Sequence, residues 1–123
     1  MLAQHLDSIP LLDLPGLKHQ TLASHKHGIH SFEVWHQSLG PGACTPLHRH
    51  DCEEVIVFTA GVGVMHYAET ETVCTAGTVL LCQPNELHRI VNTGDEDLQL
   101  YGVLAVSPVP VLDERGHVLA LPW

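Results

Sequence analysis

Two histidines and a glutamate in one short segment have the side-chain chemistry that a metal site needs. His48, His50 and Glu54 stand in residues 46–54, which read PLHRHDCEE. Alternate residues of an extended chain point to the same side, so these three share a face wherever the segment is extended. Two imidazoles and a carboxylate are a ligand set for a borderline divalent ion. A fourth candidate, His88, lies in a second run over residues 86–92.

These four residues suit an open metal site better than a closed one. Glu54 lies four residues beyond His50, so a turn or bulge must keep it within reach, and His88 must come from a neighbouring strand. Three imidazoles and one carboxylate leave positions open on a five-coordinate or octahedral ion. Ligand-binding and catalytic metals need such positions, whereas structural zinc sites are closed. The histidine-rich stretch over residues 25–30 remains an alternative, adventitious metal binder.

The elements that must position these side chains are short strands. Runs rich in Val, Ile, Thr and aromatic residues are separated by Gly, Pro and Asn turns, and no helical periodicity of three turns or more is present. Strands are expected over residues 31–39, 54–59, 63–69, 70–73, 78–82, 86–91 and 98–106. This pattern predicts an all-β sandwich or barrel.

Composition limits the classes of protein and of partner. A chain of 123 residues fits one domain, and a net charge of -9 with only 5 Lys and Arg makes nucleic acid a poor partner. No apolar run approaches the length of a membrane span, and the first residues lack the basic start of a signal peptide. We therefore expect a cytoplasmic protein whose four cysteines, which lack C-x-x-C spacing, stay free thiols.

The spacing of the candidate ligands resembles the two motifs of the cupin superfamily. The first motif is a Gly, five residues, His-x-His, three or four residues, Glu, six residues and Gly, and it is matched by Gly42, His48, His50, Glu54 and Gly61. The second motif is matched by Gly77, His88 and Asn92. Asn85 stands where the motif's turn has Gly, and Asn tolerates the left-handed backbone that such a turn needs.

The resemblance to cupins implies a fold and a ligand set. It implies an all-β, single-domain cupin, which is a double-stranded β-helix or jelly-roll barrel. It also implies a metal held by His48, His50, Glu54 and His88. We expect residues 26–110 to form the barrel, residues 1–25 an N-terminal arm that packs on the barrel or on a partner subunit, and residues 111–123 a C-terminal arm.

Residues 45–55 look more closely like the first conserved box of the plant auxin-binding proteins, and the similarity spans residues 26–110. That resemblance implies zinc, which receives the ligand's carboxylate while an apolar pocket holds the ligand's aromatic ring. By motif position, the pocket would be lined by Trp35, Gln37, Thr45, Pro46 and Ile56. Ile56 replaces an aromatic residue of that family, and the tail after Pro110 is shorter than the family's C-terminal helix, which carries an aromatic wall of the pocket.

Two classes of function remain open on these grounds. The first is a protein that binds a small carboxylate, or another oxygen ligand, through a metal inside the barrel. The second is a metal-dependent enzyme acting on a small organic molecule. Iron, manganese or nickel would suit a dioxygenase, and zinc an isomerase or hydrolase. Cupins commonly pair, and the apolar residues 11–14 can add to a partner's sheet edge, so we expect a homodimer.

Overall fold

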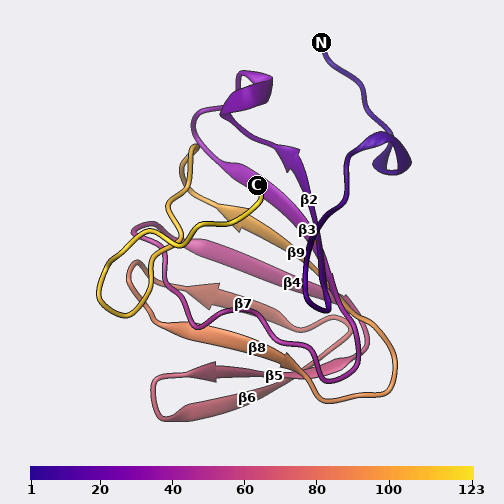
Figure 1. Ribbon diagram of the computed structural model, residues 1–123, viewed down its shortest axis with the longest axis vertical. Helices are drawn as coiled ribbons and strands as arrows, with labels where there is room; N and C mark the ends of the chain where they lie inside the picture. Colours follow the sequence, from indigo (N-terminus) through magenta and orange to yellow (C-terminus); the bar gives the residue numbers. More distant parts are fainter.

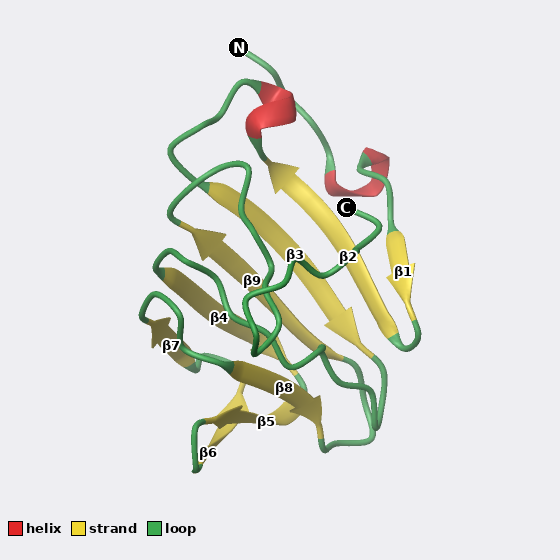
Figure 2. Cartoon of the chain, turned by 60° about the vertical axis from the view of Figure 1, so that its left-hand side comes forward, coloured by secondary structure: helices red, strands yellow, loops and turns green.

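The computed structural model describes residues 1–123, which form two antiparallel sheets (Figure 1). The larger sheet has the strand order β1-β2-β3-β9-β4-β7, and the smaller one β6-β5-β8 (Figure 2). The strands of the larger sheet are β1 (Leu12–Leu14), β2 (Leu17–Ala23), β3 (Glu33–Leu39), β4 (Glu54–Ala60), β7 (Val79–Cys82) and β9 (Leu98–Leu104). Those of the smaller sheet are β5 (Val62–Tyr67), β6 (Thr70–Thr75) and β8 (His88–Asn92). The expected all-β architecture is confirmed.

Two single-turn 3-10 helices, η1 (Leu6–Ser8) and η2 (His25–His27), complete the regular structure. Neither has the length and apolar content needed to cross a lipid bilayer.

Alternation of buried and exposed side chains along the strands builds one core between the sheets. In β3 and β9 every second residue is buried, as period-two side-chain geometry requires. Ile56 and Phe58 of β4 meet Met65 of β5 and Ile90 of β8 in the largest apolar cluster. Burying each such side chain contributes about 1.5–3 kcal/mol relative to leaving it exposed. The core lies beside the candidate ligands and holds their strands in place.

The N-terminal segment, expected to be an arm over residues 1–25, contains two strands. Its residues 12–23 form β1 and β2, and β2 pairs with β3 along its length with one irregularity between Thr21 and Ala23. Two consecutive polar residues of β2 are buried on opposite faces: His19 on the inner face beside Trp35 and Trp123, and Gln20 on the outer face, where its amide donates to the Leu6 and Ile9 carbonyls. Buried polar side chains break the apolar alternation by which a strand is recognised in a sequence.

Two tight turns fix where the strands beside the site begin and end. Gly61, between β4 and β5, has φ +84°, and a Cβ there would lie 2.5 Å from the Asp97 carbonyl oxygen, so no other residue fits. Asn85, before β8, has φ 66°. The expected left-handed turn at Asn85 is therefore confirmed.

The C-terminal segment crosses the mouth of the barrel and ends beside β2 and β3 (Figure 1). Leu112 pairs through isolated bridges with Arg49 and with Val118, which ties the segment to the chain before β4. Its last residue, Trp123, packs on His19 of β2 and on Trp35 of β3. Residues 111–123 thus form a cover over one end of the barrel.

A candidate metal centre

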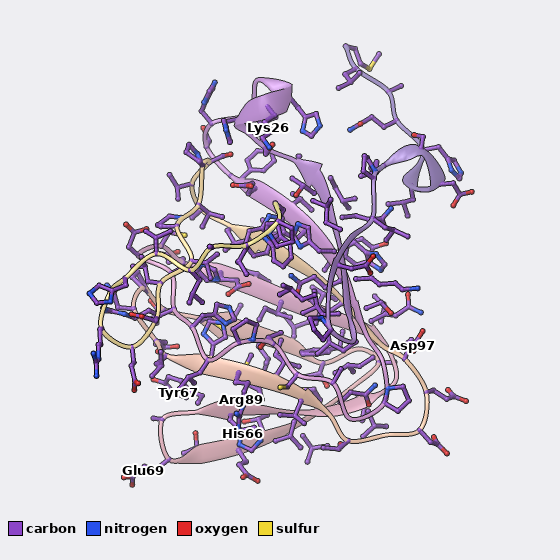
Figure 3. All side chains as sticks on the ribbon, viewed as in Figure 1. Lys26, His66, Tyr67, Glu69, Arg89 and Asp97 are labelled. Carbon is purple, nitrogen blue, oxygen red and sulfur yellow. The ribbon has the colours of Figure 1, made fainter.

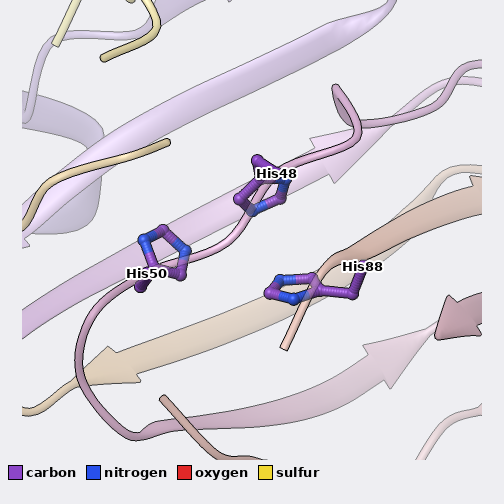
Figure 4. Close-up of side chains that lie close together, drawn as sticks. All are labelled: His48, His50 and His88. Carbon is purple, nitrogen blue, oxygen red and sulfur yellow. The ribbon is translucent and has the colours of Figure 1, made fainter. Parts of the chain in front are cut away.

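Three histidines converge inside the barrel mouth from two separate parts of the chain (Figure 4). His48 and His50 lie in the irregular segment before β4, and His88 is the first residue of β8. The backbones of His48 and His88 are paired: each N–H donates to the other's carbonyl, at 3.0 and 2.8 Å. All three side chains are buried, and their nearest ring nitrogens lie within 4.8 Å of one another.

Glu54, the first residue of β4, adds a carboxylate to this group. Its Oε2 lies 3.6 Å from His50 Nε2 and 3.5 Å from His88 Nε2. The segment between His50 and Glu54 is not a continuous strand, so the register of β4 between β7 and β9 places the carboxylate. Gly102 of β9 leaves room for it, because a Cβ there would lie 3.3 Å from Glu54 Oε1.

Backbone carbonyls fix the tautomer of each imidazole. The Nδ1 atoms of His48, His50 and His88 lie 2.7, 2.8 and 2.7 Å from the carbonyl oxygens of Pro46, Pro110 and Glu86. A carbonyl oxygen only accepts hydrogen bonds, so each neutral ring carries its proton on Nδ1. Each Nε2 then offers a lone pair, and this is the state in which histidine binds a metal.

Two buried polar atoms of the cluster have no hydrogen-bond partner. They are His50 Nε2 and Glu54 Oε2, on side chains that are 2% and 7% exposed. Buried polar groups without partners are rare because each carries a desolvation cost of about 1–3 kcal/mol. A divalent cation would satisfy both atoms at once. The residues present therefore fit a metal with three nitrogen donors and one oxygen donor.

The electrostatic environment sets the protonation states of the four side chains. Burial, together with His88 and His50, lowers the pKa of His48 to about 4. Burial opposes ionisation of Glu54, but its contacts with His88 and His50 outweigh this, and its carboxyl pKa is lowered. Burial likewise lowers the pKa of His50, whereas the contacts of His88 with Glu54 outweigh burial and raise the pKa of His88. His48, His50 and the Glu54 carboxylate are thus in the states that metal ligation requires near neutral pH, and a metal would displace the proton that His88 shares with Glu54.

A small cavity adjoins the cluster. All five expected pocket residues (Trp35, Gln37, Thr45, Pro46 and Ile56) line it, together with His48, Glu54 and His88. Its free volume is about 30 Å³, which is room for roughly two water molecules. Residues that the sequence analysis did not assign to the pocket also line it: Leu17, Ile90, Leu100, Gly102, Val111, Leu121 and Trp123.

Trp123 supplies an aromatic wall that the short tail was not expected to carry. Its ring stacks on His19 with centroids 3.8 Å apart and planes 5° apart, and it lies edge-on to Trp35 at 6.2 Å. His19 is held in turn by the Gln37 amide at 3.0 Å and the Thr21 hydroxyl at 2.8 Å. The one signal for this role in the sequence is an aromatic residue at the end of the apolar stretch over residues 118–123.

Other candidate groups lie apart from the cluster. The histidines of residues 25–30 gather into no comparable group of ligand atoms. His66 and Arg89 face each other on β5 and β8 away from the core, where His66 pairs with Glu71 at 3.3 Å (Figure 3). Cys82 of β7 is different, because its sulfur joins Glu54 and His88 in a second group of three close ligand atoms. Burial, together with Glu54 and Glu86, raises the pKa of its thiol to about 12.

Fold and site together define a small cupin: a jelly-roll barrel with three histidines and a glutamate gathered at its mouth. A cupin 2 conserved barrel protein from Salinispora arenicola CNS-205 has a similar structure, with a TM-score of 0.73 at 26% identity over 85% of this chain and 87% of that one. The expected cupin fold is confirmed.

The chain belongs to the auxin-binding protein family, whose model matches residues 5–115. It is 38% identical to auxin-binding protein 1 of Arabidopsis thaliana in an alignment 107 residues long that covers 79% of this chain and 54% of that protein. It is also 36% identical to an oxalate-binding protein of Thermotoga maritima over 67 residues, which are 54% of this chain and 55% of that one. The chain therefore spans little more than half the length of these curated relatives.

Proposed function

We propose that this protein binds a small carboxylate through a divalent metal held by His48, His50, Glu54 and His88. The observation that supports this most is the pair of buried, unpartnered atoms His50 Nε2 and Glu54 Oε2. A carboxylate ligand would occupy positions that these four residues leave open on the ion. Zinc suits this mixed nitrogen and oxygen set, and iron, manganese and nickel are the alternatives.

The size of the cavity favours a compact ligand. A free volume of about 30 Å³ accepts a group of a few atoms beside the ion, on the scale of roughly two waters. An oxalate-sized acid needs less displacement of the wall than an aromatic acid does. Two of the relatives are named for binding auxin and oxalate. Both of these ligands carry a carboxylate, and they differ in the rest of the molecule.

Polar groups in the cavity wall suit an oxygen-rich ligand. The Thr45 hydroxyl oxygen accepts a hydrogen bond from the Ile90 N–H at 3.0 Å, so its own proton is free to donate into the cavity. Apart from the proposed metal ligands His48, Glu54 and His88, the lining contains no Asp, Glu, Lys or His. General acid–base chemistry would need such a residue near the ligand. The lining therefore favours binding over the alternative of a metal-dependent enzyme, whether a dioxygenase or a zinc isomerase or hydrolase.

The test begins with elemental analysis of untagged protein purified without added metal. We expect about one divalent ion per chain, lost in His48→Ala and in His88→Ala and kept in His30→Ala, which alters an exposed residue of the histidine-rich stretch. Calorimetric titration with oxalate and with indole-3-acetate, on metal-loaded and metal-free protein, then tests the ligand. Metal retained in both site variants would refute the site. Equal carboxylate binding with and without metal would refute the role of the ion.

We also propose that two copies associate through the outer face of the larger sheet. Four apolar side chains stand exposed there on three adjacent strands: Val55 (36%), Val79 (54%), Leu81 (71%) and Val103 (39%). An apolar patch is complementary to itself, as a two-fold interface requires, and a charge of -9 opposes contact between copies elsewhere.

A further inference from the structure

Strand register places a cysteine beside the proposed metal. In the pairing of β4 with β7, Glu54 stands directly opposite Cys82. Directly opposed residues of an antiparallel pair project to the same side of the sheet, with Cβ atoms about 4.5–5.5 Å apart. Along β7, Leu80 and Cys82 turn inward while Val79 and Leu81 are exposed. The thiol therefore shares the inner face with the Glu54 carboxylate.

The side-chain geometry brings this thiol within ligating range. Ligand atoms of Glu54, Cys82 and His88 all lie within 4.8 Å of one another. Two of these three residues belong to the proposed metal set, so an ion between them is also close to the sulfur. Glu54 Oε2, on a side chain that is 93% buried, has no hydrogen-bond partner and faces this space.

We infer that Cys82 is an additional, sulfur ligand of the metal centre. This inference rests on the proposed function, because it assumes that an ion binds to the histidine and glutamate cluster. As the sulfur–metal bond forms, the thiol releases its proton to solvent, and no oxidant or reductant is required. The ion is then shared between the three imidazoles on one side and the pair Glu54 and Cys82 on the other.

A sulfur donor changes which ions the site prefers. Thiolates favour soft or borderline ions such as zinc, cobalt and cadmium, while manganese prefers oxygen donors. The four nitrogen and oxygen ligands alone would not separate zinc from the other ions strongly. With Cys82 included, the site is biased toward thiophilic metals, and this determines which chemistry the barrel supports.

The ordinary alternative is that Cys82 fills space at the edge of the core. It packs against the main apolar cluster together with Leu80 and Ala43. The two roles of Cys82, packing residue and metal ligand, predict the same stability for a conservative substitution. They predict different absorption spectra of the bound metal. The readout must therefore report a sulfur–metal bond directly.

Cobalt(II) titration followed by absorption spectroscopy tests the inference in the full chain under reducing conditions. We expect about one cobalt ion per chain with an intense near-ultraviolet sulfur-to-metal charge-transfer band. Cys82→Ser should abolish the band and keep the bound cobalt, because the four nitrogen and oxygen ligands remain. Cys44→Ser, which changes an exposed thiol outside the cluster, should leave both unchanged. Manganese binding should be the same in all three proteins.

Each alternative outcome is distinct. Cobalt bound at full stoichiometry without the charge-transfer band, or with a band that persists in Cys82→Ser, would overturn the inference and leave the proposed function standing. A failure of the wild-type chain to bind any ion would overturn both. If Cys82→Ser does not fold, X-ray absorption of the zinc-loaded wild type decides instead. One sulfur at about 2.3 Å beside nitrogen and oxygen at about 2.0–2.2 Å supports the inference, and a shell without sulfur refutes it.

Discussion

His19 should make the stability of the barrel fall in mild acid, and replacing it should reduce that fall. Burial, followed by the proximity of His36, lowers the pKa of His19 from its ordinary value of 6.5 to about 3. The folded state therefore resists protonating this ring, whereas the unfolded chain protonates it near pH 6.5. Above pH 6.5 the protonation of His19 therefore has no effect on the free energy of unfolding. As pH falls from 6.5 toward 3, it lowers that free energy progressively.

The size of the effect follows from the pKa difference. At pH 5 the unfolded state is favoured by about 1.5 pK units, or about 2 kcal/mol, relative to neutral pH. In His19→Phe this pH-dependent loss disappears, but the Gln37 amide and the Thr21 hydroxyl lose their partner. Each unsatisfied group costs about 1–3 kcal/mol at every pH. The variant should be less stable at pH 7, and its deficit should shrink by about 2 kcal/mol at pH 5.

Urea unfolding of metal-free protein at pH 7 and pH 5, followed by tryptophan fluorescence, measures both quantities. Metal-free conditions are needed because a metal ion bound to the protein would stabilise the fold and mask the effect of His19 protonation. The control His30→Phe makes the same change at an exposed ring and should alter neither the stability nor its pH dependence. A His19→Phe deficit that is the same at both pH values would refute the claim that this ring stays neutral in the fold.

Three further predictions concern the pocket and the sheet surface. Gly102→Val places a side chain against Glu54 Oε1 and should weaken zinc affinity by about 10–100-fold, measured with a competing chelator. Deleting Trp123 removes the wall stacked on His19 and should strengthen calorimetric binding of indole-3-acetate to zinc-loaded protein; weaker binding would show that the indole helps to hold the ligand. Leu81→Glu places a charge on the exposed apolar face and should shift light-scattering mass from dimer to monomer, while Val73→Glu on β6 should not.

Most strands from β3 onward were predictable because their patterns are local. In β4 an apolar residue alternates with a less buried one until Gly61 ends the strand, and β9 shows the same alternation. The strand β2 was not predictable in this way. Its inward face includes His19, whose burial depends on partners from β3 and from the far end of the chain. The residues next to His19 in the sequence do not indicate such distant partners.

The ligand cluster was predictable for a reason that is only partly local. The parity argument places His48, His50 and Glu54 on one face of an extended chain, but residues 48–53 form no continuous strand. They are joined to the rest of the barrel by isolated bridges and single backbone hydrogen bonds. The backbone pairing of His48 with His88 and the position of Glu54 at the start of β4 bring the groups together. Spacing within the motifs indicated which residues meet. Two of the carbonyls that orient their rings, those of Pro46 and Glu86, lie in the same segments, whereas the Pro110 carbonyl comes from a distant part of the chain.

The two cupin motifs therefore predict one end of the cavity in related chains but not the other end. The metal end is built from residues within two compact motifs, so chains that share the motifs share the donors. The opposite end is closed by Trp123 on His19, a contact between the last residue and the second strand. Because that contact depends on the tail and not on the two motifs, a relative that shares the donors but lacks the tail contact need not accept the same ligand. If the proposed carboxylate binds at the metal end, we expect the contact between Trp123 and His19 to influence which carboxylate fits.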